Sequence, residues 1–144
     1  MKDRELIQKA LQARKRSYSP YSHFQVGAAL LAEDGQVFTG CNIENAAYTP
    51  CNCAERTAFF KAVSEGVYGF RAIAVAGGMD TAQTLDFCAP CGVCRQVMME
   101  FCDPESFRIL LAKSEDEYRE FTLAQLLPMG FGPENLNKGA QTND

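Results

Sequence analysis

The sequence predicts an α/β protein built as a three-layer α/β/α sandwich around a mixed five-stranded sheet. Strand patterns alternate with helical patterns along most of the chain, which is typical of a sheet covered by helices. Two strand patterns near the N-terminus are separated by the turn sequence Glu33-Asp34-Gly35, which predicts an antiparallel hairpin. Later strand patterns are continuously apolar, as in parallel sheets. We therefore expect an N-terminal antiparallel hairpin joined to parallel strands.

The first helix is predicted from Leu6, Ile7 and Ala10 at helical spacing, and Pro20 lies in the segment that interrupts the pattern. The basic run Arg14-Lys15-Arg16 ends this helix, where cations complement the helix dipole, and we expect it to face solvent. The expected elements, in order, are a helix at 3–17, strands at 26–32 and 36–43, a helix at 53–65, a strand at 71–76, a helix at 91–102, strands at 107–112 and 118–122, and a short helix at 123–127.

The other elements are predicted from apolar runs and from residues that start or stop helices. The segments 26–32, 71–76 and 107–112 are almost uninterrupted apolar runs, as expected of buried strands. Gly66 stops the second helical pattern, and Pro90 stands just before the third. Apolar and polar residues alternate sufficiently in segment 36–43 to predict the second strand of the hairpin. The pattern of the last strand is the weakest.

Residues 1–132 are expected to form a single domain, followed by a polar tail at 133–144. A chain of 144 residues with 47% hydrophobic composition is long enough to bury one core. The net charge of −4 has the wrong sign for a protein that binds nucleic acid. No segment has the apolar length of a signal peptide or a membrane span. We expect a soluble, cytoplasmic protein with no membrane partner.

The cysteines carry the strongest functional signal. Seven cysteines in a chain without an export signal indicate thiols that bind metal or are buried, rather than disulfides. Cys53 is followed two residues later by Glu55, and Pro90-Cys91-Gly92-Val93-Cys94 follows downstream, a pattern described for zinc-dependent base deaminases. Three protein ligands leave one corner of a tetrahedral zinc free for water, as in catalytic sites. The pattern predicts Zn²⁺ bound by Cys53, Cys91 and Cys94.

Glu55 is expected to carry protons at this metal. Zinc lowers the pKa of its bound water, so that hydroxide is available to attack an electrophilic carbon. In a base deamination, Glu55 would protonate ring N3 as zinc-bound hydroxide attacks C4, and would then pass a proton to the leaving amine. The alternative is an ordinary acidic residue in the first turn of a helix. The short spacing from Cys53 favours the catalytic interpretation.

Arg56 has two interpretations on the residues alone. Three thiolates leave a net charge of about −1 on the zinc site, and a neighbouring cation would offset it. Arg56 directly follows Glu55 and could supply that cation, or it could be an exposed surface residue. Both halves of the motif fall at predicted helix starts, which favour thiolates.

The remaining cysteines leave other metal sites open. Cys88 is spaced from Cys91 and Cys94 as in some iron–sulfur proteins, but the next cysteine does not follow the bacterial cluster pattern. A fourth cysteine could also close a structural zinc site. By default we expect Cys41, Cys51, Cys88 and Cys102 to be small buried apolar residues.

With these residues in view, the chain resembles the cytidine deaminase family, specifically the small nucleoside deaminases that assemble as homotetramers. The resemblance covers nearly the whole chain. Besides the cysteine motif, it rests on YSPYSHFQVGAA at 18–29, GCNIENAAY at 40–48, Leu126-Leu127-Pro128 and Phe131-Gly132-Pro133. It implies a cytidine deaminase-like fold, and the connection at 77–89 looks longer than in many compact relatives.

The resemblance also implies a nucleoside site. Asn42 and Glu44 match positions that hold ribose hydroxyls, Phe24 matches an aromatic that packs on the nucleoside, and the backbone around Ala54 would contact the pyrimidine. From the residues alone, Phe24 could simply be core, and Asn42 and Glu44 could be turn residues. A carboxylate at Glu44 would repel a phosphate ester, which favours free nucleosides.

Three further residues take their roles from the resemblance. Arg56 matches an arginine that hydrogen-bonds to the ligand thiolates, which favours the charge-offset interpretation. Tyr48 and Phe131 match aromatics that help to complete an active site across subunit boundaries. The resemblance therefore implies that these two residues act in a homotetramer.

We thus expect a hydrolase with one Zn²⁺ per subunit that converts cytidine and 2′-deoxycytidine to uridine and 2′-deoxyuridine plus ammonia, in pyrimidine salvage. One alternative is a deaminase of the same fold that acts on another aminopyrimidine. The other is a non-catalytic cysteine-rich metal-binding module, which would leave Glu55 without a role.

Overall fold

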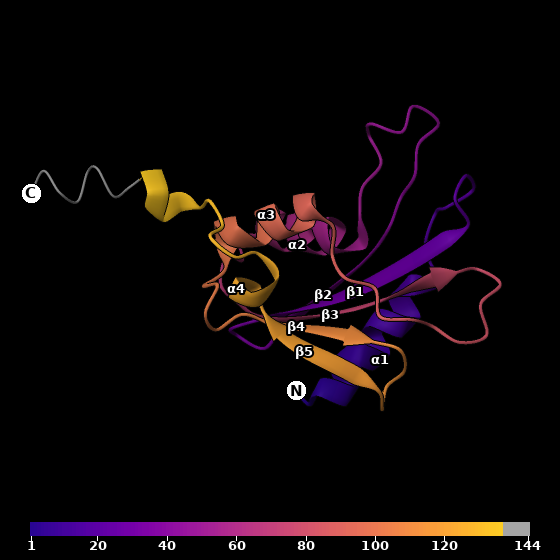
Figure 1. Cartoon of the computed structure of the whole chain (residues 1–144), viewed down its shortest axis with the longest axis horizontal. Helices are drawn as coiled ribbons and strands as arrows, with labels where there is room; N and C mark the ends of the chain where they lie inside the picture. Colours follow the sequence, from indigo (N-terminus) through magenta and orange to yellow (C-terminus); the bar gives the residue numbers. More distant parts are fainter. Residues whose placement is uncertain (137–144) are drawn as a thin grey trace, which may run out of the picture.

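The computed structural model describes residues 1–136 and contains a five-stranded sheet flanked by helices (Figure 1). The elements are α1 (Asp3–Arg14), β1 (Phe24–Ala32), β2 (Val37–Cys41), α2 (Ala54–Ser64), β3 (Phe70–Met79), α3 (Gly92–Phe101), β4 (Arg108–Ala112), β5 (Tyr118–Thr122) and α4 (Leu123–Leu126). The strands lie in the order β2-β1-β3-β4-β5. Every predicted helix and strand is present, and the predicted mixed five-stranded sheet is confirmed.

The strand directions follow from the connections between them. β1 pairs antiparallel with β2, as the hairpin predicted, and also antiparallel with β3. β3 and β4 are parallel, because α3 carries the chain back between them. β5 follows β4 after a short turn and pairs antiparallel with it. The described sheet therefore has its parallel pair at β3 and β4, and antiparallel pairs on either side.

The two faces of the sheet carry side chains of different size. Successive residues of a strand point to opposite faces, so each apolar run supplies both. One face presents mainly alanines, including Ala29 and Ala74, against α1. The other presents larger residues such as Ile73, which pack with Phe59 of α2 and Met98 of α3. Figure 1 shows α1 on one side of the sheet and α2 and α3 on the other, which makes the three layers.

Two glycines let the helices approach the hairpin closely. A Cβ atom at Gly27 would overlap the backbone of α1 at Ala10 and Arg14. A Cβ atom at Gly40 would overlap Ala54 O and would lie 2.6 Å from Ala58 N, both in α2. Only glycine fits at such contacts, so these two positions set how closely α1 and α2 lie against β1 and β2.

The third strand is longer than predicted. β3 continues to Met79, whereas the apolar pattern ended at residue 76. Gly77 and Gly78 pair with Val26 and Gln25 of β1, so the neighbouring strand outweighs the low strand propensity of glycine. The first three residues of the expected loop at 77–89 are thus in the sheet.

The expectation that Arg14-Lys15-Arg16 faces solvent is wrong for Arg14. Its guanidinium is partly buried and donates to the carbonyls of Gln25, Gly78 and Met79 at 2.8 to 2.9 Å. These carbonyls belong to the ends of β1 and β3, so Arg14 joins α1 to the sheet. A single helix pattern cannot reveal acceptors that come from distant strands.

The predicted polar tail at 133–144 lies mostly outside the described residues. Residues 133–136 form a helical turn, and 137–144 are not described. The boundary between a domain at 1–132 and this tail stays a prediction. Within the described part of the chain, every helix is too short or too polar to cross a lipid bilayer.

Candidate active site

Two helix starts bring the three predicted ligand cysteines together. Cys53 immediately precedes α2, Cys91 immediately precedes α3, and Cys94 lies in the first turn of α3. The sulfur atoms of Cys53 and Cys91 are 3.7 Å apart, and those of Cys91 and Cys94 are 3.6 Å apart. All three sulfurs lie within 4.8 Å of one another. Segments far apart in the sequence thus form one thiol cluster.

This cluster fits a zinc ion. With Zn–S bonds of about 2.3 Å and tetrahedral angles, two sulfur ligands are expected to lie about 3.8 Å apart. The sulfur separations of 3.6 and 3.7 Å agree with that value. Thiolates are also among the ligands that zinc prefers. Among the described residues no other metal-ligating group joins the three cysteines, which argues against a closed four-cysteine site.

Arg56 lies beside the cluster and is half-buried, not a freely exposed surface residue. Its Nη2 donates to Cys53 Sγ at 3.3 Å. A hydrogen bond from Cys94, together with hydrogen bonds from Arg56 and Cys91, lowers the pKa of Cys53 to about 5 in spite of burial. The geometry therefore places a positive charge beside Cys53, and the role of Arg56 in offsetting the thiolate charge stays a prediction.

Glu55 is buried next to the cysteines. Its side chain is only 4% exposed, and its Oε1 has no hydrogen-bond partner among the described residues. Burial, with a smaller contribution from the charge of Cys53, raises the pKa of Glu55 from 4.5 to about 7. An ordinary acidic residue in the first turn of a surface helix would be solvated and ionised. Glu55 instead has the environment of a group that exchanges protons near neutral pH.

A cavity of about 320 Å³ opens in front of Glu55. The predicted site residues in its lining are Phe24, Asn42, Glu44, Cys53, Ala54, Glu55, Arg56 and Cys91. Cys94 is fully buried behind this wall. The side chains expected to bind a nucleoside and those expected to bind the metal therefore share one cavity, although they come from β1, the segment after β2, and the starts of α2 and α3.

Asn42 fixes the backbone at the edge of this cavity. Its Oδ1 accepts from Val26 N at 2.9 Å, and its Nδ2 donates to Phe24 O at 2.8 Å. The amide thereby holds the start of β1, where Phe24 lies. Oδ1 can still accept one more hydrogen bond and Nδ2 can still donate one more, so both atoms could also bind a ligand.

Glu44 is held by a residue that the sequence analysis missed. Its Oε1 accepts from the backbone N–H groups of Tyr21 and Ser22, and its Oε2 accepts from the Ser22 hydroxyl. Ser22 Oγ also accepts from Phe24 N at 3.0 Å, and Ser22 lines the cavity. Nothing in the local pattern marks Ser22, because its importance depends on a contact 22 residues away.

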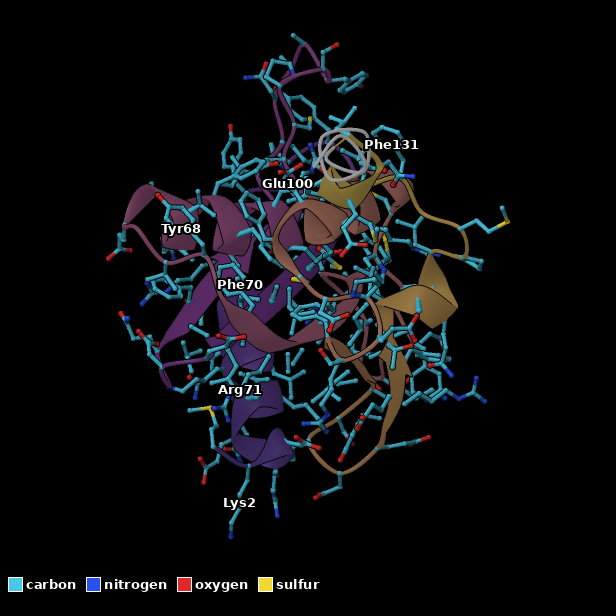
Figure 2. All side chains as sticks on the ribbon, turned by 90° about the vertical axis from the view of Figure 1, so that its left-hand side faces the viewer. Lys2, Tyr68, Phe70, Arg71, Glu100 and Phe131 are labelled. Atoms are coloured by element: carbon cyan, nitrogen blue, oxygen red, sulfur yellow. The ribbon has the colours of Figure 1, made fainter. Side chains whose placement is uncertain are left out.

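Tyr48 and Phe131 do not line the cavity of their own subunit. Tyr48 is 69% exposed and Phe131 is 56% exposed. Figure 2 shows Phe131 on the side of the sheet opposite Lys2, which lies at the start of α1. Their expected role across a subunit boundary stays a prediction, since it involves a second chain.

The expectation that the four spare cysteines are buried is wrong. Cys41, Cys51, Cys88 and Cys102 are all only partly buried. Cys51 and Cys88 line the cavity in front of Glu55. Burial raises the pKa of Cys88 to about 11, so this thiol is protonated at neutral pH. Neither residue joins the three-cysteine cluster.

The chain belongs to the cytidine deaminase family. Residues 1–109 match the family model described as "Cytidine and deoxycytidylate deaminase zinc-binding region". This match confirms the resemblance that the sequence motifs indicated, and it agrees with the fit of the cysteine cluster to zinc.

Individual relatives match over almost their whole length. A cytidine deaminase of Sporosarcina psychrophila is 51% identical over 137 residues, which cover 95% of this chain and 96% of that protein. The crystal structure of cytidine deaminase from Burkholderia pseudomallei has a TM-score of 0.82 and 46% identity, and the match covers 91% of this chain and 100% of that one. The structure from Mycobacterium tuberculosis has a TM-score of 0.71 and 39% identity, with 89% and 95% covered.

Proposed function

We propose that this protein catalyses the hydrolytic deamination of cytidine and 2′-deoxycytidine to uridine and 2′-deoxyuridine, with release of ammonia, in pyrimidine salvage. The observation that carries the proposal is the buried Glu55 carboxyl, whose Oε1 is unpartnered among the described residues and which lines the same cavity as Cys53 and Cys91. Relatives named cytidine deaminase, 51% identical over more than nine-tenths of the chain, support the same reaction.

Cys53, Cys91 and Cys94 would hold one Zn²⁺ per subunit. When bound, the zinc supplies a Lewis acid that brings the pKa of a coordinated water towards neutrality. Arg56 would offset the extra negative charge of three thiolates through its hydrogen bond to Cys53. The partly buried position of Arg56 makes this interaction stronger than it would be in bulk water.

Glu55 would move the protons of the reaction. A carboxyl whose pKa is about 7 can accept a proton from water and release it again at neutral pH. Protonation of the pyrimidine at N3 makes C4 more electrophilic, and protonation of the exocyclic nitrogen lets it leave as ammonia. Both atoms lie on one edge of the base, so a single buried carboxyl can serve them in turn.

The opposite end of the cavity would bind the sugar. Glu44 Oε2 accepts one hydrogen bond, from Ser22, and keeps a lone pair for a ribose hydroxyl. Asn42 keeps one donor and one acceptor site beyond its bonds to the backbone. Phe24 would pack on the nucleoside, and the backbone at Ala54 would contact the base. A carboxylate in this position disfavours a 5′-phosphate or a polynucleotide.

The active form would be a cytoplasmic homotetramer that binds neither nucleic acid nor membranes. Several aromatic side chains are exposed in the single subunit, including Tyr48, Phe60, Tyr68 and Phe131 at 47 to 69%. Exposed aromatics are enriched at interfaces between proteins. Tyr48 and Phe131 would lie beside the cavity of a neighbouring subunit.

The test follows the ultraviolet absorbance of cytidine and 2′-deoxycytidine after addition of the purified zinc-loaded protein. Wild type should convert both nucleosides, and Glu55→Gln should lose about 10²- to 10⁴-fold in kcat while its zinc content is unchanged. If both proteins hold one zinc per subunit and neither converts a nucleoside, the proposal fails in favour of another aminopyrimidine substrate or a non-catalytic metal-binding module.

A further inference from the structure

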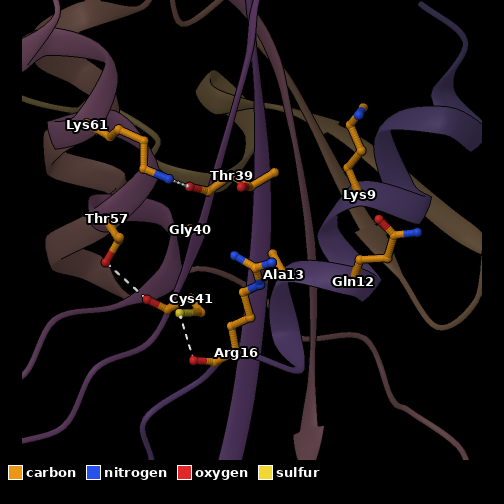
Figure 3. Close-up of a pocket in the computed structure, with 9 residues that line it drawn as sticks. All are labelled: Lys9, Gln12, Ala13, Arg16, Thr39, Gly40, Cys41, Thr57 and Lys61. Carbon is orange, nitrogen blue, oxygen red and sulfur yellow. Dashed lines mark hydrogen bonds between the residues drawn. The ribbon is translucent and has the colours of Figure 1, made fainter.

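A second cavity of about 320 Å³ lies at the free edge of the sheet. Figure 3 shows its walls: α1 and the residues just after it on one side, α2 on the other, and β2 between them. We call it the edge cavity. It shares no lining residue with the cavity in front of Glu55.

The backbone of β2 presents the polar groups of Thr39 and Cys41 to the edge cavity. In an antiparallel pair, alternate residues direct their N–H and C=O groups towards the partner strand. Asn42 N donates to Val26 O at 3.2 Å, so residues of β2 that alternate with Asn42 face β1. Thr39 and Cys41 have the opposite parity. Since β2 is the outermost strand, their N–H and C=O groups point out of the sheet.

Both outward carbonyls are already bonded to side chains of α2. Lys61 Nζ donates to Thr39 O, and Thr57 Oγ1 donates to Cys41 O at 3.0 Å (Figure 3). The N–H groups of Thr39 and Cys41 face away from β1, and no loop carbonyl of the described residues accepts from them. The strand edge thus offers two hydrogen-bond donors, while its acceptors are occupied. Such an edge is unsuited to pairing with a strand of another copy, which needs acceptors as well as donors.

Three cationic side chains line the same cavity as these donors. Lys9 and Arg16 reach the edge cavity from one side of β2, and Lys61 reaches it from the other. Within the described residues, no carboxylate lines the edge cavity and none of the three cations forms an ion pair. Burial raises the pKa of Cys41, and the charges of Lys61 and Arg16 oppose that rise, as expected of cations beside this thiol.

This concentration of positive charge occurs in a protein whose net charge is −4. The cations are not needed to neutralise a carboxylate in the same cavity. The edge cavity therefore has hydrogen-bond donors, a positive electrostatic potential and few acceptors. These properties favour a ligand that carries negative charge and accepts several hydrogen bonds.

We propose that the edge cavity binds a small phosphate-bearing anion. The oxygens of a phosphate group can accept from one of the two backbone N–H groups and from the side chains together. The planar guanidinium of Arg16 can bind two of those oxygens, and Lys61 keeps two of its three N–H donors beyond the bond to Thr39. Three cations favour a divalent anion over a monovalent one such as chloride. The site is independent of the proposed deamination.

The test monitors the backbone amides of Thr39 and Cys41 in ¹⁵N-edited spectra of the deuterated full-length protein. Inorganic phosphate and adenosine 5′-monophosphate are titrated separately, at constant ionic strength set with sodium chloride. The same titrations use Arg16→Gln, which removes a proposed ligand contact. Lys15→Gln is the matched control, because Lys15 is an exposed cation on the neighbouring residue that does not line the edge cavity.

We expect saturable shifts of both amides with phosphate, about tenfold weaker binding by Arg16→Gln, and unchanged binding by Lys15→Gln. Tighter binding of the nucleotide than of phosphate would identify a nucleotide as the ligand, and equal binding would identify the phosphate group alone; either result supports the site. The proposal is overturned if neither probe shifts these amides saturably, or if Arg16→Gln and Lys15→Gln weaken binding equally.

Discussion

Glu55 combines a carboxyl group with almost complete burial, and this combination has a measurable effect on stability. Its pKa is raised from 4.5 to about 7 in the folded protein. A carboxyl with a raised pKa contributes stability that is fully present below pH 4.5 and is lost as the pH rises through 7. Glu55→Gln removes this dependence while keeping the shape of the side chain.

We therefore predict that the stability of metal-free Glu55→Gln relative to metal-free wild type increases as the pH rises from 5 to 8, by about 3 kcal/mol at most. Urea denaturation at both pH values measures the difference in the free energy of unfolding. The cysteines titrate in both proteins, and their interaction with the Glu55 charge is part of the measured difference. A difference that is the same at pH 5 and pH 8 would contradict the raised pKa.

Ser22 is predicted to position the sugar-binding end of the cavity. Ser22→Ala removes the hydroxyl that donates to Glu44 and accepts from Phe24 N. We expect the KM for cytidine to rise about five- to tenfold with a much smaller change in kcat, because the reacting end of the base is untouched. Ser22→Thr keeps a hydroxyl and should retain most of the affinity. An equal fall of kcat in Ser22→Ala would argue against a role in binding.

The cysteine cluster could be predicted because its residues form a described zinc-binding pattern. Each ligand lies at a helix start, and the spacings around Cys53 and Cys91 are visible in the sequence. The role of Ser22 and the contacts of Arg14 could not be predicted in this way. They depend on acceptors 22 and up to 65 residues away, whose position is set by the assembled sheet.

The packing of α2 on β2 depends on Gly40. Gly40→Ala would place a methyl group against Ala54 and Ala58, so α2 would have to move outward, together with Cys53 and Glu55. We predict a loss of about 1 to 3 kcal/mol of stability and a lower affinity for zinc. Thermal denaturation and competition with a chelator measure the two effects.

Gly92→Ala is the matched control for this substitution. It adds the same methyl group at the start of α3, where it would meet no atom within 4 Å apart from its chain neighbours and its own helix backbone, and alanine favours helix over glycine. Its melting temperature should equal or slightly exceed that of wild type. If Gly40→Ala were as stable as Gly92→Ala, the structure would tolerate a methyl group between α2 and β2, and the prediction would be wrong.

The elements themselves were predictable where one strand or helix carries its own pattern. Residues 118–122 were predicted as a strand with the bounds that β5 shows. The end of β3 was missed because Gly77 and Gly78 have low strand propensity, and only the ladder with β1 holds them extended. Element ends are therefore set by neighbours, whereas element types follow from periodicity.

Several aromatic side chains are exposed to solvent in the single subunit. Contact with a second subunit would remove their apolar surface from water. Tyr48 and Phe131 belong to different segments, and neither touches the cavity of its own chain. If the protein is a homotetramer, sedimentation at micromolar concentration should give about four times the mass of the 15.9 kDa chain. A stable monomer would remove the basis for assigning either residue to a neighbouring site.

Mixed oligomers distinguish a residue that serves a neighbouring site from one that serves its own. Phe131→Ala is expected to lower kcat/KM about tenfold, and Glu55→Gln is expected to lower kcat about 10²- to 10⁴-fold. In a hybrid, a Phe131→Ala subunit keeps an intact Glu55, and a neighbouring Glu55→Gln subunit supplies the missing aromatic ring. Hybrids refolded from the two variants should therefore be more active than the sum of the separate proteins.

If Phe131 acts within its own subunit, no site in the hybrid holds both groups, and the activity equals the sum. Met129→Ala provides the control, because Met129 is fully exposed two residues away and has no predicted role in a site. It should keep wild-type activity by itself, and mixing it with Glu55→Gln should produce no gain. A gain confined to the Phe131→Ala hybrids would assign one catalytic site to two chains, and it would explain why Phe131 does not line the cavity in front of Glu55 in its own chain.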